Sequence, residues 1–265
     1  MQMISREKLL KLVSKPDGIV ESENVGQAFS YKDFLKESHK KLAEAKREDE
    51  YEKESLAYMA LRDGWIKDHC PPIEYLGEGS SRLALAIDGG KCLKVAMNDD
   101  GIEQNENEIA VLEAGKGYAC FPKLYAYDKK MKYSLVVDCC CEAQPSDFWK
   151  TYGLACNLVV GTIWQLVNDG LDISKTRSYF LRCIEDPKLG AEDVWENFEK
   201  RLVFLSKLEK LKDNDMKWES MWMLASFCAA YPTLLSLEDL ESEVNWGMAG
   251  RNGGLCPVVI DAGIA

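Results

Sequence analysis

The sequence is poor in the residues that much hydrolytic and metal-dependent chemistry uses. Its 265 residues include only two histidines, His39 and His69. Ser-His-Asp and Cys-His catalysis both need a histidine as general base, so this shortage argues against them. The ten cysteines form no C-x-x-C pair, and three of them, Cys139, Cys140 and Cys141, are consecutive. We therefore expect reduced thiols that are mostly buried, because a zinc site would need cysteine ligands from distant positions.

Long apolar runs are also missing. No run reaches the roughly 18–20 residues that a membrane-spanning helix requires. The sequence begins Met-Gln-Met-Ile-Ser-Arg-Glu-Lys, without the apolar core of a signal peptide. The net charge of −11 argues against a general nucleic-acid binder, because phosphate contacts need a basic surface. We expect a soluble, cytoplasmic protein with neither a membrane nor a nucleic acid as partner, although a local basic patch stays compatible with this charge.

The sequence contains enough apolar residues for a substantial core. With 46% apolar residues, a chain of this length suits one large domain or two small ones. The pattern changes twice along the chain and predicts three consecutive regions. Residues 1–72 are polar and helix-rich, residues 73–138 carry short β-type runs, and residues 139–265 are mostly helical.

The first region predicts a helical extension. Ser5 can cap one helix, and Ser30 can begin another with Asp33 as its capping-box partner. The segment Lys40 to Glu54 consists almost entirely of charged residues and alanine. It is typical of an exposed helix with ion pairs between residues four apart, and we favour this interpretation over a binding tail. Pro71-Pro72 ends the helical pattern.

The second region predicts a small antiparallel sheet with one helix. Its β-type runs are separated by turn residues such as Asp88-Gly-Gly90, and they cover residues 83–87, 92–96, 124–127 and 134–137. One helical pattern, from about Asn105 to Glu113, lies between the second and third of these runs.

The third region predicts several helices followed by a strand. Two amphipathic faces recur at helical spacing: Val194, Trp195, Phe198, Leu202, Leu205 and Leu208 in one helix, and Trp218, Met221, Trp222, Ala225 and Cys228 in another. The Trp and Met residues could line a cofactor-binding site, but a packed core is the better interpretation. A buried strand, 257–260, then precedes Asp261-Ala-Gly263.

The strongest indication of function lies in the second region. The segment Tyr75-Leu-Gly-Glu-Gly-Ser-Ser-Arg82 has glycines that let a backbone approach a phosphate, although taken alone they are better explained by a plain hairpin. In the predicted strand 92–96, which lies across the Asp88-Gly-Gly90 turn, Lys94 must point to the face opposite Leu93 and Val95. Glu108 in the next helix has the spacing of an inward carboxylate. A lysine paired with such a glutamate is the arrangement that orients the α- and β-phosphates of ATP.

These residues resemble the N-lobe of the protein-kinase-like fold family. The resemblance implies that Gly77, Gly79 and Ser80 lie in the nucleotide loop. It also makes Lys94 the phosphate-binding lysine and Glu108 its partner in the helix. The segment from Val137 to Cys139 falls where the family has its hinge between the two lobes, with backbone groups available for the adenine of ATP.

The C-terminal residues add a second, separate match. Asp261-x-Gly263 after an apolar strand looks like the metal-binding D-x-G element, and Asn245 looks like the asparagine of the catalytic loop. The resemblance implies that Asn245 and Asp261 bind Mg²⁺ together. The alternative is an asparagine that caps a turn and an aspartate that ends a strand.

Three features depart from the family pattern. Arg82 stands where the third glycine of the loop is expected. No H-R-D triplet is present, because Leu240 occupies the position five residues before Asn245. Either a one-residue insertion restores Asp239 as the residue that accepts the substrate proton, or the base is missing. The printed sequence has no activation segment, so either it is C-terminally shortened or the helices between 147 and 237 form the whole second lobe.

We therefore expect an α+β, bilobal kinase-like fold with a helical extension (1–72), an N-lobe (73–138) and a reduced C-lobe (139–265). The expected function is ATP-dependent phosphoryl transfer with Mg²⁺ to an unknown acceptor. The missing activation segment favours a small molecule or the protein itself as acceptor. Two alternatives stay open: a catalytically dead pseudokinase that responds to nucleotide, and an interaction protein whose acidic surface and charged helix do the work.

Overall fold

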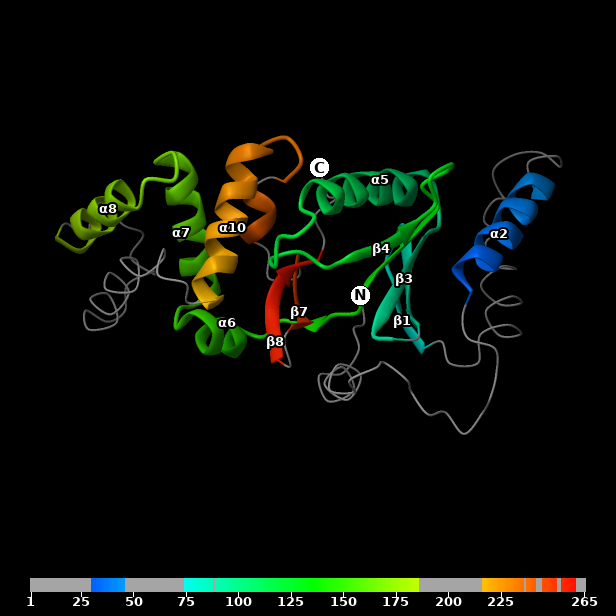
Figure 1. Ribbon diagram of the computed structural model, residues 1–265, viewed down its shortest axis with the longest axis horizontal. Helices are drawn as coiled ribbons and strands as arrows, with labels where there is room; N and C mark the ends of the chain where they lie inside the picture. Colours follow the sequence, from blue (N-terminus) through cyan, green and yellow to red (C-terminus); the bar gives the residue numbers. More distant parts are fainter. Residues whose placement is uncertain are drawn as a thin grey trace. The chain divides into compact units, whose positions relative to one another are not determined.

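The chain adopts an α+β fold with antiparallel sheets (Figure 1). The structure, a computed structural model, describes residues 30–45, 74–87, 89–185, 216–235, 237–241, 245–251 and 254–260. Tertiary contacts divide the chain into two compact units. The first, which we call the sheet unit, comprises Met1–Ala110, Lys123–Glu142 and Ala249–Leu255. The second, the helical unit, comprises Val111–Pro122, Ala143–Met248 and Cys256–Ala265.

A five-stranded antiparallel sheet forms the centre of the sheet unit. Its strands are β1 (Glu74–Glu78), β2 (Arg82–Ile87), β3 (Lys91–Ala96), β4 (Leu124–Tyr127) and β5 (Ser134–Asp138). Their order is β1-β2-β3-β5-β4. The last of these strands along the chain, β5, therefore lies between β3 and β4, and β4 is at the edge of the sheet. The four strands predicted from β-type runs are confirmed as β2 to β5.

Helix α5 (Asp99–Ala114) connects β3 to β4 and begins earlier than the sequence predicted. The expected start near Asn105 was wrong because Gly101 weakens the helical pattern of the first turn. Asn98 supplies the missing start signal. Its Oδ1 accepts the Gly101 backbone N–H at 2.9 Å, and Asp99 and Asp100 place negative charge at the positive end of the helix.

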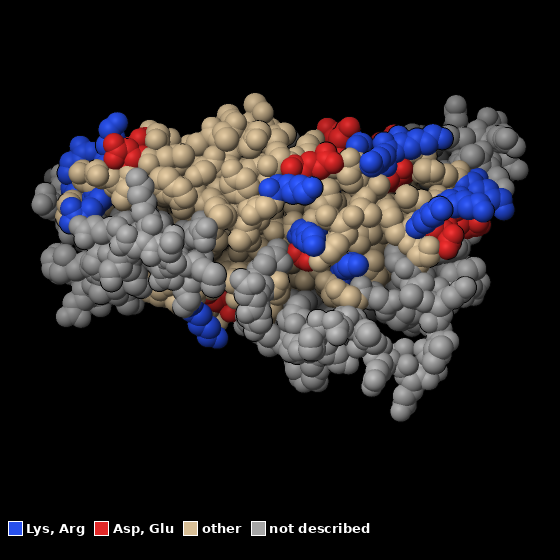
Figure 2. All heavy atoms as spheres, viewed as in Figure 1, with Lys and Arg blue, Asp and Glu red and all other residues tan. Residues whose placement is uncertain are grey.

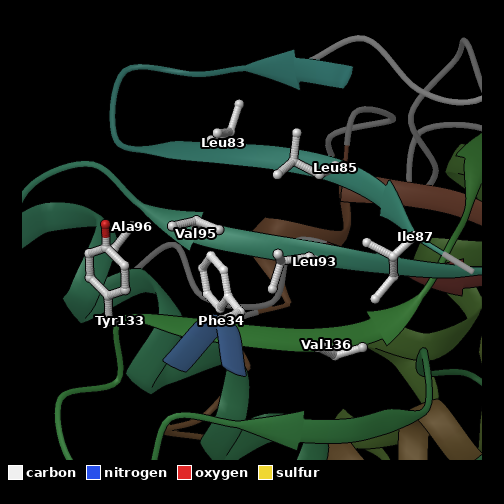
Figure 3. Packing of buried hydrophobic residues seen from close by; sticks show 9 residues of the cluster. All are labelled: Phe34, Leu83, Leu85, Ile87, Leu93, Val95, Ala96, Tyr133 and Val136. Atoms are coloured by element: carbon white, nitrogen blue, oxygen red, sulfur yellow. The ribbon is translucent and has the colours of Figure 1, made fainter. Parts of the chain in front are cut away.

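One face of the sheet carries an apolar cluster. Leu83 lies opposite Val95 and Leu85 lies opposite Leu93, so the larger side chains of β2 and β3 share this face. Phe34 from helix α2 (Tyr31–Ala45) packs against them (Figure 3). Lys94 alternates with Leu93 and Val95, as predicted, and therefore belongs to the opposite face.

Polar contacts add to the packing of α2. The Tyr31 hydroxyl donates to the Ser134 backbone carbonyl at 3.0 Å, and His39 Nε2 lies 2.8 Å from Asp128 Oδ2. The helix begins after Ser30, whose Oγ accepts the Asp33 N–H at 3.3 Å, as predicted from the sequence. This part of the expected N-terminal extension thus covers one face of the sheet.

The helical unit is built around α7 (Cys156–Asn168) and α10 (Met216–Ala230), which pack against each other. Helices α6 (Pro145–Tyr152) and α8 (Ile173–Glu185) and the 3₁₀ helix η4 (Glu238–Glu241) also contact α7. Phe227 of α10 has ring contacts with Tyr118, Phe121 and Tyr231. Met221, Ala225 and Cys228 are buried, which agrees with the interpretation of this face as core.

A second sheet contains the C-terminal hairpin. Its order is β6-β7-β8, with β6 at Cys141–Glu142, β7 at Trp246–Arg251 and β8 at Gly254–Val259. Val258 and Val259 are completely buried, as expected of the last strand.

The described cysteines behave as small apolar residues. All eight are free thiols, and burial raises the pKa of Cys92 to about 11 and that of Cys228 to about 12. Cys92 and Cys228 therefore stay protonated and unreactive at neutral pH. Among the described residues, no helix combines the length and the apolar character needed to cross a bilayer.

Charges of both signs are mixed on the surface. On the face shown in Figure 2, the described Lys and Arg side chains lie among Asp and Glu side chains and uncharged areas. Several sequence predictions fall outside the described residues: the helix capped by Ser5, the charged segment after residue 45, the helix with Val194 to Leu208, and Asp261-x-Gly263.

Candidate functional site

The lysine and the glutamate singled out in the sequence are in direct contact. Lys94 Nζ donates to Glu108 Oε1 at 2.7 Å and to Oε2 at 2.8 Å. Lys94 is 6% exposed and Glu108 is 1% exposed, so this is a buried ion pair. Alternation along β3 and the inward position on α5 direct the two side chains toward each other, on the sheet face opposite Phe34.

Arg82 is a third member of this cluster, and sequence reasoning missed its role. Its Nη1 donates to Glu108 Oε2 at 2.6 Å. Arg82 is only 9% exposed, and it lies at the start of β2, on the same sheet face as Lys94. A charged residue in place of the third glycine was noted only as a departure. Arg82 could have been interpreted as a second ion-pair partner for Glu108.

The two cations determine the ionisation of Glu108. Burial by itself raises the pKa of this carboxyl, but the charges and hydrogen bonds of Lys94 and Arg82 outweigh burial and hold the pKa below its ordinary value. Glu108 is therefore an anion at neutral pH, bonded through both of its oxygens.

The glycine segment forms a tight turn between β1 and β2. Gly77 has a φ of 152°, a conformation that residues with a β-carbon rarely adopt, and it lies at an irregularity in the pairing of β1 with β2. The Gly79 backbone N–H donates to the Arg82 carbonyl at 2.9 Å, which closes the turn. Gly79 and Ser80 are exposed at its tip. We call residues 77–82 the glycine turn.

Hydrogen bonds connect the glycine turn to the start of α5. The Met97 N–H donates to the Ser81 carbonyl at 2.7 Å, and Ser81 Oγ donates to Gln104 Oε1 at 2.7 Å. Asn98 Nδ2 donates to the Ser80 carbonyl at 3.2 Å. The close approach also requires Gly101, because a β-carbon there would collide with the Ser81 carbonyl oxygen.

Replacing Gly101 by alanine is expected to separate the turn from the helix. Backbone must move to relieve the clash, so we expect the free energy of unfolding to fall by about 1–3 kcal/mol. Gly161→Ala in α7 is the matched control, because a β-carbon there meets open space. Better helix propensity should make that variant neutral or more stable by up to about 1 kcal/mol. Urea denaturation of both variants measures the difference, and equal stability of the two would contradict the described contact.

A second contact holds the middle of α5. Asn105 is completely buried, and its Nδ2 donates to the carbonyls of Lys132 at 2.9 Å and Tyr133 at 3.0 Å. Asparagine is a poor residue for a helix interior, which is the sequence feature that could have indicated such a contact. Helix α5 is thus bonded to the glycine turn, to the loop before β5 and, through Glu108, to β2 and β3.

The segment predicted to contact adenine is hydrogen-bonded within the sheet unit. The Cys139 N–H donates to the Gly90 carbonyl at 2.8 Å, and the Asp138 N–H donates to the Lys123 carbonyl at 3.1 Å. Val137 is paired within the sheet with Cys92 and Leu124. An adenine at this segment would therefore have to use other groups than these two N–H donors.

The residues predicted near the C-terminus belong to the helical unit. Asn245 is buried, and its backbone carbonyl accepts the Ile260 N–H at 2.8 Å. Asp239 lies in η4, and Asp261 lies outside the described residues. The structure thus brings Asn245 beside the residue that precedes Asp261. Within the described part of the chain, no group of three His, Cys, Asp or Glu side chains could hold a metal ion.

Comparisons with known proteins do not place the chain in a family. No family model, curated protein or solved structure matches it.

Proposed function

We propose that the protein is an ATP-dependent phosphotransferase of the kinase-like fold, with an acceptor still to be identified. The observation that supports this most is the buried Lys94–Glu108 pair. It joins β3 to α5, the helix that follows β3. The two side chains meet on one face of a sheet whose first two strands are connected by the glycine turn. Buried lysines are rare without a function or a strong structural need, and here the lysine has a fixed carboxylate partner.

Each side chain has a defined task in this proposal. Lys94 binds oxygens of the α- and β-phosphates, and Glu108 holds its ammonium group in position. The exposed tip of the glycine turn, Gly79 and Ser80, covers the phosphates with its backbone. Little covalent chemistry is asked of these residues, so the rate depends on placement and electrostatics.

In this proposal Asn245 and Asp261 would hold a magnesium ion. The backbone bond between Ile260 and Asn245 supports the pairing, because it brings the two chain segments together. An amide and a carboxylate oxygen suit a hard divalent cation. When bound, Mg²⁺ would neutralise the β- and γ-phosphate oxygens. Asp239 is proposed to orient the acceptor hydroxyl.

Nucleotide titration combined with a turnover assay tests the proposal. We expect ATP to raise the melting temperature of the full chain, with a larger shift when Mg²⁺ is present. Release or transfer of the γ-phosphate should accompany binding. Absence of any shift up to millimolar ATP would refute the proposal.

A nucleotide-responsive scaffold is the second candidate. It is favoured by the absence of an H-R-D triplet before Asn245. The same experiment separates the two functions, because a scaffold would bind ATP without turning it over.

A further inference from the structure

We propose that Arg82 is a positioning residue that keeps the Lys94–Glu108 pair assembled before a nucleotide binds. This inference rests on the proposed function, since the pair matters to catalysis only if Lys94 binds phosphates. It assigns a role to a residue that the kinase-like pattern does not include, at the position where that pattern has a glycine.

The shared carboxylate is the first argument. Glu108 Oε2 accepts from both Lys94 Nζ, at 2.8 Å, and Arg82 Nη1, at 2.6 Å. Charge-assisted bonds of this length are roughly twice as strong as neutral ones. A carboxylate held from two strands cannot rotate away from Lys94 without breaking its bond to Arg82.

The backbone of the same turn supplies the second argument. Arg82 follows Ser81, whose carbonyl is bonded to Met97, just before α5, and whose hydroxyl is bonded to Gln104 in the second turn of α5. The side chain of Arg82 then reaches Glu108 further along that helix. Hydrogen bonds therefore join the glycine turn to α5 both near the start of the helix and at Glu108.

The third argument concerns the rest of the helix. Asn105 fixes α5 to the carbonyls of Lys132 and Tyr133, one turn before Glu108. With these contacts in place, the outward movement of α5 that would separate Glu108 from Lys94 has to break several buried hydrogen bonds. Each buried bond that is broken without replacement is costly. The pair is thus preassembled in the free protein.

Arg82 is expected to act through Lys94 rather than on the nucleotide itself, and a double-mutant cycle tests this. Binding of ADP and of adenosine to the full chain would be measured by calorimetry for wild type, Arg82→Ala, Lys94→Ala and the double variant. We expect Arg82→Ala to weaken ADP binding about tenfold, equivalent to one hydrogen bond to a charged group. Adenosine, which has no phosphate, should bind to wild type and Arg82→Ala alike.

The decisive comparison is made in the Lys94→Ala background. If Arg82 only positions Lys94, removing it there changes ADP affinity less than twofold. A further tenfold loss would show that Arg82 contacts the phosphate directly and would overturn the proposal. Arg82→Lys should recover part of the ADP affinity, and Arg182→Ala, an exposed arginine of the helical unit, should bind as wild type does.

Hydrogen exchange tests the positioning role without any nucleotide. We expect the backbone amides of residues 99–110 to exchange faster in Arg82→Ala than in wild type, and Arg82→Lys to restore their protection. Unchanged exchange in Arg82→Ala would overturn the proposal. If wild type binds neither ADP nor ATP, the proposed function fails, whereas the exchange result still decides whether Arg82 holds α5.

Discussion

Replacing Lys94 by alanine should lower the rate of phosphoryl transfer from ATP by on the order of 10²–10³-fold. The ammonium group would stabilise negative charge at the phosphates in a buried setting, where water does not substitute for it well. Binding of ADP should weaken as well, because the same group contacts the nucleotide before the reaction. The measurement is initial-rate kinetics with labelled ATP, together with calorimetric binding of ADP.

The fold is expected to survive this substitution. Glu108 keeps its bond to Arg82 when Lys94 is truncated, so the carboxylate is not left alone. Lys91→Ala is the matched control, because Lys91 lies on the same strand but contacts the ring of Tyr125, at 4.7 Å from its centroid. Wild-type turnover in Lys94→Ala, or an equal loss in Lys91→Ala, would exclude the assigned site.

Glu108→Gln should have the largest effect on stability. The substitution removes the negative charge shared by two buried cations and leaves Arg82 and Lys94 close to a neutral amide. Breaking a buried ion pair by removing one partner costs about 3–5 kcal/mol. Urea denaturation of the full chain measures this loss. Glu106→Gln, an exposed position on the same helix, should change stability by less than about 0.5 kcal/mol.

The pH dependence of this difference has a definite sign. The folded state lowers the pKa of Glu108 below its ordinary value of 4.5. A carboxyl of this kind stabilises the fold fully above its unfolded pKa, and the contribution is lost as pH falls through the lower folded pKa. The stability difference between wild type and Glu108→Gln should therefore be constant from pH 7 to 5 and shrink on acidification below 4.5. A difference that grows in acid would contradict the described charge state.

The sequence was informative where a side chain's direction follows from local geometry. Alternation within β3 was enough to predict that Lys94 points away from Leu93 and Val95. Strands β2 to β5 could be predicted because short β-type runs bounded by turn residues are local features, whereas β1 was not predicted. Contact between Lys94 and Glu108 followed from these directions together with the kinase-like spacing.

Features that depend on tertiary pairing were not predicted. The bond from Arg82 to Glu108 joins residues 26 positions apart, and nothing local to Arg82 indicates its partner. The start of α5 was misplaced because Gly101, which lowers helix propensity, is required for a close approach to Ser81. Similarly, the amphipathic pattern of α2 indicates an apolar face but not the sheet that Phe34 covers.

The backbone donors at residues 138 and 139 illustrate the same limit. The sequence suggested that they were available for adenine, whereas both are used in hydrogen bonds to carbonyls of other segments. Backbone hydrogen bonding between distant segments depends on register, which a single sequence does not specify.

Affinity labelling of Lys94 tests the central claim most directly. An acyl phosphate of ATP transfers its acyl group to lysines that lie beside the bound phosphates, and peptide mass spectrometry identifies the modified residue. We predict that Lys94, although buried, is modified and that excess ATP prevents the modification. Labelling confined to exposed lysines such as Lys129 and Lys130, with no protection by ATP, would contradict a nucleotide-phosphate site at the Lys94–Glu108 pair.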